Sequence, residues 1–328
     1  MNDYGLSVLA QYGMKKAETR RTRGALLCRY EQGVYLLKAF EGSARKLEKQ
    51  QELLLSVRAS GKCQVDYFLE NQDGELISID RDGNGYTLQK WYEGRECDTK
   101  SAEDIRRSAA AMAELHNVMH LPFQADYGMR TLDEEFERHN RELRKIRKFI
   151  RNKGASNAFE KLFLSSADWF LEKGEEALGL LRVSGYEELL EEAHAQGRVC
   201  HGEYNQHNVL IMKNSAAVTG FGHWNFDLQT ADLYRFSRKI LEKYNWDKKV
   251  FQEIVRQYEK HRPLRAEEKE NLRIRFLYPE KYWKLANHYF SHNKAWISEK
   301  NVEKLRILVE QRETWEDFGK KCFIKGLF

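Results

Sequence analysis

The residues best suited to carry chemistry lie in one short segment, His201-Gly202-Glu203-Tyr204-Asn205-Gln206-His207-Asn208. The segment holds a carboxylate and, five residues later, a carboxamide. Gly220-Phe221-Gly222 begins twelve residues after Asn208, beyond an apolar stretch. A carboxylate can take a proton from a hydroxyl group, and a carboxamide oxygen can contribute to a divalent-cation site. The spacing therefore predicts a loop, a strand and a second loop that together form a site.

This order of groups resembles the catalytic segments of phosphotransferases with a protein-kinase-like fold, which place an Asp base, an Asn and an Asp-Phe-Gly metal site in sequence. Glu203 stands at the position of the base and Gly220 at that of the magnesium-binding Asp. One extra methylene displaces a carboxylate by about 1.5 Å, and about 1 Å of misplacement can cost about a hundredfold in rate. Glycine offers magnesium no side-chain oxygen. We expect an impaired phosphotransferase that retains Glu203, as a degenerate base, and Asn208.

Lys38 is the first candidate for contact with a nucleotide. It lies inside an otherwise apolar strand predicted over residues 34–40, where an ammonium group is costly unless it has a partner. We interpret it as the lysine that holds phosphates; the alternative is an edge-strand lysine that extends to water. Glu48 and Glu52 lie one turn apart in the helix predicted over residues 43–60. Either could pair with Lys38, and we favour Glu52.

Upstream of Lys38, the chain lacks the glycine-rich loop of a kinase. Residues 20–24 provide three arginines and one glycine instead. Arg23 and Gly24 are therefore candidates for contact with an anion without a metal, and the alternative is that the arginines are simply solvated. No metal ligand set is predicted.

Two further residues are predicted to be structural. His201 begins the motif, and Asp232 lies in Ala231-Asp232-Leu233. In a kinase-like fold, an aspartate at the position of Asp232 is buried and braces the backbone of the catalytic loop. Asp227 lies seven residues after Gly220 and is an alternative acid for a metal.

The periodicity of apolar residues predicts an α+β, bilobal, protein-kinase-like fold. Residues 1–93 form an N-lobe of mainly antiparallel strands (25–30, 34–40, 64–69 and 86–91) with one helix, and residues 94–328 form a helical C-lobe that carries the degenerate catalytic loop. Ser101 is an expected N-cap, and long helices are expected over residues 132–153 and 158–181 and from residue 232 onward. The basic segment 144–153 is interpreted as the solvent-exposed face of a core helix, whose apolar stripe consists of Leu143, Ile146, Phe149 and Ile150.

Composition limits the classes of function. The 328 residues include 55 basic and 50 acidic side chains, a net charge of +5, which does not indicate a nucleic-acid partner. No apolar run reaches the length of a membrane span. Five scattered cysteines without a CxxC pair fit a reducing compartment and argue against a zinc site.

Five segments resemble the CotS family of bacterial spore coat proteins, relatives of aminoglycoside and choline kinase-like phosphotransferases. They are residues 35–38, 89–95, 115–116, 201–210 and the segment Tyr278-Pro279-Glu280-Lys281-Tyr282-Trp283-Lys284-Leu285-Ala286-Asn287. The resemblance implies a two-lobed kinase-like fold, production in the cytoplasm of the mother cell and deposition on the spore coat. It implies other coat proteins as partners, with ATP or a small anion as a ligand and magnesium in doubt. We expect a pseudokinase that acts by binding and assembly; the alternative is an ATP-dependent small-molecule phosphotransferase.

Overall fold

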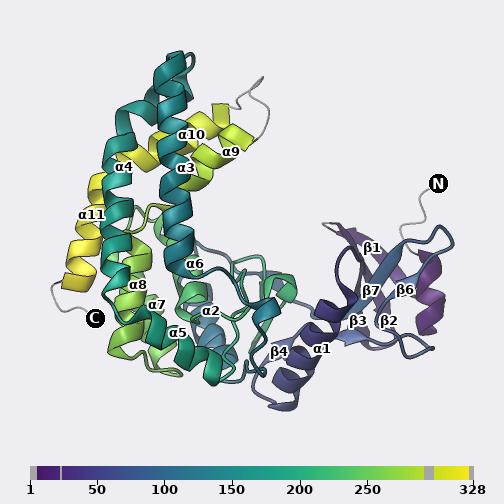
Figure 1. Cartoon of the computed structure of the whole chain (residues 1–328). Helices are drawn as coiled ribbons and strands as arrows, with labels where there is room; N and C mark the ends of the chain where they lie inside the picture. The colour runs from purple at the N-terminus through teal and green to yellow at the C-terminus, as the bar shows by residue number, and fades with distance from the viewer. Residues whose placement is uncertain (1–5, 23, 292–298, 325–328) are drawn as a thin grey trace. The chain divides into compact units, whose positions relative to one another are not determined.

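The structure is a computed structural model and describes residues 6–22, 24–291 and 299–324 (Figure 1). Within this part of the chain, two compact units are found: residues 1–122, 197–225 and 257–262 in the first, and residues 123–196, 226–256 and 263–328 in the second. The lobe boundary predicted at residue 93 lies inside the first unit. Residues 64–65 and 95–96, on either side of this boundary, both pair with strands of the segment 201–222, which holds the motif.

An antiparallel sheet forms one part of the first unit, with strands in the order β1-β2-β3-β7-β5 and with β6 paired to β7. The strands predicted over residues 25–30 and 34–40 are confirmed as β2 and β3, which form a hairpin in which Tyr30 lies opposite Gly33. Glu31 in the turn has a left-handed φ of 51°. The strands are β1 Glu18–Thr22, β2 Ala25–Tyr30, β3 Gly33–Ala39, β5 Phe68–Leu69, β6 Ser78–Ile79 and β7 Gly85–Trp91, and the 3-10 helix Leu6–Tyr12 precedes them.

A second sheet, in the order β4-β10-β9-β8, carries the motif segment; its strands are β4 Gln64–Val65, β8 Arg95–Glu96, β9 Val209–Ile211 and β10 Ala216–Val218. We predicted one strand over residues 64–69, and this was wrong: β4 and β5 belong to different sheets. Val65 lies opposite Val218 in a parallel pair. Since parallel strands end side by side, Asp66 lies beside the residues that follow β10.

Helices α1, Ala44–Ala59, and α2, Ala102–His116, complete the main elements of the first unit. The helix predicted over residues 43–60 and the N-cap predicted at Ser101 both agree with the structure. The Ser43 hydroxyl accepts the backbone N–H of Lys46, and the Ser101 hydroxyl accepts that of Asp104. Helix α1 buries Leu47, Leu54 and Val57, the apolar residues whose spacing indicates a helix, together with Leu53.

The second unit is helical. The two long helices are confirmed as α3, Leu132–Lys153, and α4, Ala158–Arg182, while α5, Tyr186–Ala195, was not predicted. The C-terminal region contains α6 Thr230–Leu241, α7 Lys248–Glu259, α8 Ala266–Leu277, α9 Glu280–Ser291, α10 Glu299–Glu310 and α11 Arg312–Gly319. The short helices Ala125–Tyr127 and Lys320–Ile324 also belong to this unit. Residues 257–259, at the end of α7, belong to the first unit. None of the helices in the described ranges is long and apolar enough to cross a membrane.

Stacked aromatic rings fill part of the core of this unit. Tyr282 stacks on Phe163 and Phe170, with ring centroids 5.3 Å and 4.0 Å away. Its hydroxyl donates to the carbonyl of Phe163 at 2.8 Å, so the polar end of this buried side chain is satisfied. The Tyr278–Asn287 segment of the sequence thus contributes to packing.

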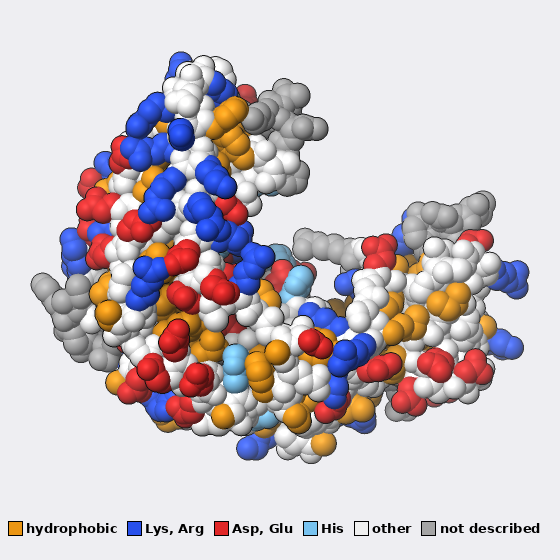
Figure 2. Space-filling model, viewed as in Figure 1, with side chains coloured by type: hydrophobic (Ala, Val, Ile, Leu, Met, Phe, Trp, Pro, Cys, Tyr) orange, Lys and Arg blue, Asp and Glu red, His pale blue; other side chains and the backbone are white. Residues whose placement is uncertain are grey.

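The basic segment of α3 behaves largely as predicted. Leu143, Ile146 and Ile150 are buried, and Lys and Arg side chains cover the outer face of the helix (Figure 2). Phe149, which the periodicity placed on the core stripe, is 43% exposed instead. It packs edge-on against Phe290, with ring centroids 5.6 Å apart.

Candidate functional site

His201 fixes the start of the motif by two hydrogen bonds. Its side chain is fully buried. Nδ1 accepts the backbone N–H of Glu203 at 3.1 Å, and Nε2 donates to the carbonyl of Thr219 at 3.0 Å. These roles correspond to the neutral tautomer with its proton on Nε2. The imidazole thus joins the loop to the end of β10, which supports the structural role proposed for His201.

Gly202 allows the loop to approach the next segment of backbone closely. It has a φ of +80°, and a Cβ atom there would lie 1.9 Å from the carbonyl oxygen of His223. Any other residue would have to shift the backbone, so this position requires glycine.

The two catalytic-loop candidates, Glu203 and Asn208, are brought together. The Glu203 carbonyl accepts one N–H from the side chain of Asn205 and one from that of Asn208, both at 3.0 Å. The Glu203 carboxylate is 49% exposed, and its Oε2 lies 3.5 Å from Nε2 of His223, which is longer than a good hydrogen bond. The loop is rigidly cross-linked through its backbone, while the carboxylate remains accessible.

Gly220 follows β10 in the left-handed conformation, with φ 82° and ψ 42°. The 3-10 helix Phe221–His223 begins immediately after it. A Cβ atom on Gly220 would lie 2.7 Å from Oδ1 of Asn208, so the carboxamide fills the space where a side chain would start. Residue 220 supplies no carboxylate, and in the described ranges no group of three or more His, Cys, Asp or Glu could hold a metal ion. Glycine at residue 220 therefore offers no side-chain oxygen to a magnesium ion bridged to phosphates.

Asp66 is the residue that our sequence reasoning missed. Its side chain is 1% exposed, and Oδ2 accepts the backbone N–H of Gly220 at 2.9 Å. Oδ1 has no hydrogen-bond partner among the described residues. Burial raises the pKa of the carboxyl to about 7, although the hydrogen bond from Gly220 and the charge of Lys38 oppose this shift. A signal was present: an aspartate interrupts the apolar run between Val65 and Leu69.

Lys38 lies in β3, as predicted, and is exposed. The expected pairing with Glu52 does not occur: Oε2 of Glu52 lies 2.6 Å from Nζ of Lys49 on the outer side of α1. Glu48 is also exposed. Gln50 and Gln51 are the buried polar side chains in this turn, and Gln51 bonds both the carbonyl and the N–H of Phe68. Tethering of β5 thus fixes the rotation of α1 and turns its glutamates toward solvent.

The arginine-rich segment before Lys38 is a strand and a tight turn. Arg20 and Arg21 lie in β1 and are exposed, and Thr22 pairs with Ala25 across the turn. Gly24 has a φ of +66° with open space around its Cβ position, and Arg23 lies outside the described residues. Gly24 thus serves the turn geometry, and contact of Arg23 or Gly24 with an anion remains a prediction.

Asp227 and Asp232 belong to the second unit. Asp227 is held within that unit, since its Oδ1 accepts from Nη2 of Arg275 at 3.1 Å and from the backbone N–H of Leu228 at 2.7 Å. This pairing leaves it poorly suited to the metal role considered above. Asp232 lies in the first turn of α6 with a fully buried side chain, and its bracing of the catalytic loop remains a prediction.

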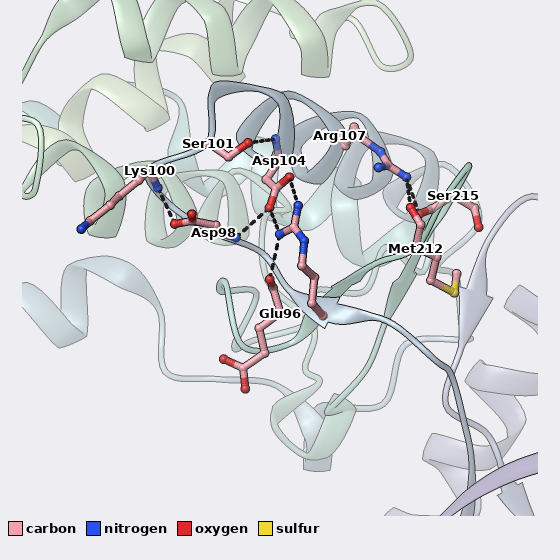
Figure 3. Close-up of polar contacts among 9 residues, drawn as sticks. Glu96, Asp98, Lys100, Ser101, Asp104, Arg107, Met212 and Ser215 are labelled. Atoms are coloured by element: carbon pink, nitrogen blue, oxygen red, sulfur yellow. Dashed lines mark hydrogen bonds and ion pairs between the residues drawn. The ribbon is translucent and has the colours of Figure 1, made fainter.

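A second group that sequence reasoning missed joins α2 to β8, the strand that pairs with β9 (Figure 3). Asp104, at the start of α2, is 2% exposed and binds the guanidinium of Arg95 through both carboxylate oxygens. It also accepts the backbone N–H of Asp98 at 2.8 Å. The Arg95 hydrogen bonds lower the pKa of the Asp104 carboxyl. The pair anchors β8 to α2.

The anchored strand then holds the motif. Oε2 of Glu96 lies 2.5 Å from Nδ1 of His207. Cys97 donates its backbone N–H to the carbonyls of Gln206 and Val209 at 3.1 Å and 3.0 Å. From α2, Nη2 of Arg107 donates to the carbonyls of Met212 and Ser215 at 2.8 Å and 2.6 Å (Figure 3). The start of β9 is therefore held by the backbone of Cys97, and the turn that follows β9 is held by the side chain of Arg107.

The fold and the motif define a protein with the kinase-like fold of the aminoglycoside and choline phosphotransferases. An aminoglycoside phosphotransferase from Alicyclobacillus acidocaldarius superimposes with a TM-score of 0.86, covering 97% of this chain and 94% of its own at 17% identity. Spectinomycin phosphotransferase, solved with ADP and spectinomycin, gives a TM-score of 0.57, with 14% identity and coverage of 95% and 97%. Choline kinase LicA from Streptococcus pneumoniae gives 0.51, with 12% identity and coverage of 93% and 97%.

The sequence matches the family described as "Spore coat putative kinase YutH" over residues 7–322. The chain belongs to this family of spore coat kinase-like proteins. It is also 24% identical over 164 residues to spore coat protein S of Bacillus subtilis (strain 168), a match that covers 49% of this chain and only about half, 47%, of that relative. The resemblance read from the sequence, and the fold that it implied, are confirmed.

Proposed function

We propose that this chain is a kinase-like component of the spore coat that acts by binding and assembly, with phosphotransfer lost. The family to which the chain belongs supports deposition in the spore coat among other coat proteins, and the proposal includes synthesis in the cytoplasm of the mother cell. The main support for the loss of phosphotransfer is the glycine at residue 220. This residue offers no carboxylate, and Asn208 occupies the space from which a side chain would extend.

The chemistry of phosphoryl transfer explains why this observation carries weight. In phosphoryl transfer the protein itself does little covalent chemistry. The rate therefore depends on how well the reacting groups are positioned and on neutralisation of the phosphate charge by metal ions. Magnesium is held by carboxylates together with phosphate oxygens. Without a carboxylate at residue 220, and with the longer Glu203 as base, both contributions are weakened at once.

The second candidate is an ATP-dependent small-molecule phosphotransferase, and one observation favours it. The carboxylate of Glu203 is accessible, while its backbone carbonyl is held in place by the side chains of Asn205 and Asn208. A hydroxyl group of a substrate could therefore reach this carboxylate. Spectinomycin phosphotransferase binds ADP, which makes ATP the nucleotide to test.

A thermal-shift titration distinguishes the two candidates. A ligand that binds only the folded state raises the melting temperature by mass action. We expect ATP with magnesium to raise the melting temperature no more than ATP with a chelator. A magnesium-dependent ATP affinity in the low micromolar range would contradict the loss of phosphotransfer.

The assembly role needs its own measurement, namely the position of a fluorescent fusion in sporulating cells. We expect the fusion to reach the coat, and Glu203→Ala to leave its deposition unchanged, because binding rather than proton abstraction is the activity proposed. Loss of deposition with Glu203→Ala, in a variant that remains folded, would favour the enzyme instead.

A further inference from the structure

The outer side of α3 is basic over the second half of the helix. Residues 143–153 contain no acidic side chain. Residues three or four positions apart are neighbours on a helix surface, so basic side chains at this spacing form one stripe. The stripe, which we call the basic face, consists of exposed side chains without an ion pair among the described residues, namely Arg141, Lys145, Lys148 and Arg151.

The basic face differs from the exposed surface of the other helices. Elsewhere an exposed arginine pairs with a glutamate three residues earlier, as Arg256 and Arg306 do. The helix dipole favours cations in the last turn, which accounts for Arg151 but not for Arg141 or Lys145. Like charges one turn apart also destabilise a helix slightly. Local helix stability therefore does not explain the basic face.

Helix α5, in the same unit, carries the opposite charge. It contains four glutamates and no lysine or arginine. Glu192 pairs with Arg265 at 2.8 Å. Glu187, Glu188 and Glu191 are exposed and have no ion pair within the part of the chain that the structure describes, and we call them the acidic face. Figure 2 shows acidic side chains gathered over α5, apart from the basic side chains along α3. The two faces therefore do not neutralise each other within one copy.

We propose that the basic face of α3 binds the acidic face of α5 on a second copy of this chain. The inference names a contact and a partner beyond the proposed function, and it rests on that function in one respect, namely that the chain acts by binding and assembly. One such contact leaves a basic face free on one copy and an acidic face free on the other, so further copies can be added.

The surroundings of the basic face favour a narrow partner over a flat anionic membrane. Arg144 and Arg147 pair with Glu175 and Asp168 of α4, and the two acidic side chains are 43% and 69% exposed. A membrane would approach these carboxylates together with the basic face and would be repelled by them. A single helix can lie along the stripe without meeting them.

Each face also lies beside an exposed apolar side chain. Phe149 follows Lys148 in α3 and is 43% exposed, and Val183, shortly before α5, is 81% exposed. Exposed ion pairs alone contribute little to affinity, and burial of apolar surface is the main driving force of most protein association. A contact between copies that covers these side chains supplies both.

Sedimentation velocity of the purified full chain tests self-association. We expect the wild type to associate at an ionic strength of about 0.1 M, where charges act over about 10 Å, and to be monomeric at about 1 M, where they act over about 3 Å. Loss of three exposed ion pairs corresponds to roughly tenfold weaker association, which we expect for the triple variant Lys145→Gln, Lys148→Gln, Arg151→Gln. The matched control changes the net charge equally and should associate as the wild type does; it replaces with Gln three exposed lysines of other elements, Lys100, Lys249 and Lys304.

A charge exchange identifies the two faces. One variant makes both faces mainly acidic, by Lys145→Glu, Lys148→Glu and Arg151→Glu. The other makes both faces basic, by Glu187→Lys, Glu188→Lys and Glu191→Lys. Each variant alone should stay monomeric because like charges meet, and an equimolar mixture should associate again because each basic face finds an acidic one. Circular dichroism checks that the variants fold, and the Gln variant decides if one of them does not.

Several results would overturn the interface. They are a wild type that stays monomeric at about 0.1 M ionic strength, a control that weakens association as much as the α3 variant, and a mixture that does not associate. Binding of a monomeric wild type to phosphatidylglycerol vesicles would assign the basic face to a membrane instead.

The proposed function and this interface can fail separately. If the fluorescent fusion does not reach the coat while the purified protein associates through these faces, the coat role is wrong and the interface stands. If the fusion reaches the coat and the purified protein stays monomeric, the interface is wrong and the coat role stands.

Discussion

Replacing Asp66 with Asn should change how the stability of this protein depends on pH. Burial raises the pKa of the Asp66 carboxyl from 3.8 to about 7. An acid whose pKa is higher in the folded state binds its proton more tightly there. Its contribution to stability is therefore fully present below pH 4 and is lost as the pH rises to about 7. Asn cannot ionise, and its side-chain oxygen can still accept the N–H of Gly220.

The magnitude follows from the shift of about three pH units. Each unit corresponds to about 1.4 kcal/mol, so ionisation of Asp66 costs about 4 kcal/mol of folding free energy in full. Part of this cost is already present at pH 5, because the Asp66 carboxyl of the unfolded chain, with its ordinary pKa of 3.8, is mostly ionised at that pH. Between pH 5 and pH 8 we therefore expect the stability of Asp66→Asn relative to the wild type to rise by about 2.5 kcal/mol.

Urea unfolding at pH 5, 6, 7 and 8 measures this difference, because titration of all other groups cancels between wild type and variant. Asp73→Asn replaces an exposed acid in the same unit and is the control, for which we expect a difference that barely changes with pH. The reasoning fails if the Asp66→Asn difference is equally flat. In that case the carboxyl is ionised across the range and must have a compensating partner in the free protein.

The remaining predictions concern local strain and burial. Gly220→Ala should destabilise the protein by about 1–2 kcal/mol or more, from its left-handed φ and its contact with the neighbouring carboxamide, whereas Gly222→Ala has open space around it and should cost less in urea unfolding. Asp232→Ala should lower the melting temperature by several degrees because the side chain is fully buried, and Glu203→Ala should change it little because that carboxylate is half exposed; the reverse order would contradict this assignment. Asp104→Ala leaves a guanidinium and a backbone N–H without their acceptor, so unfolding should become easier by about 2–3 kcal/mol at pH 7. The loss should shrink on acidification, since the lowered pKa of the Asp104 carboxyl means that its contribution disappears only at low pH.

The Gly220 geometry also bears on restoring activity. The sequence alone suggests that Gly220→Asp combined with Glu203→Asp would recover metal-dependent nucleotide binding. In the structure, the new Cβ would lie 2.7 Å from Oδ1 of Asn208, so the carboxamide must move first. We therefore expect the double variant to be less stable than the wild type and to gain no magnesium-dependent ATP binding in a thermal-shift assay. A clear gain would show that Asn208 relaxes at low cost.

Local signals in the sequence were sufficient for the elements and for the motif. The N-cap at Ser101, the apolar spacing of α1, and the lengths of α3 and α4 depend on neighbours within one or two turns, and each agrees with the structure. The spacing of the segment from His201 to Gly222 likewise identified the fold, because chemistry at a loop requires fixed intervals along the chain.

Which side chains meet across that motif was decided only by the tertiary structure. The sequence favoured Glu52 as the partner of Lys38 because helix spacing cannot tell which face of α1 turns inward; the bonds from Gln51 to Phe68 settle that rotation. Asp66 was missed because residues 64–69 read as one strand, whereas the run divides between two sheets. Strand pairing between residues more than 150 positions apart places its carboxyl against Gly220. Such contacts depend on register between distant strands, and no local pattern in a single sequence records that register.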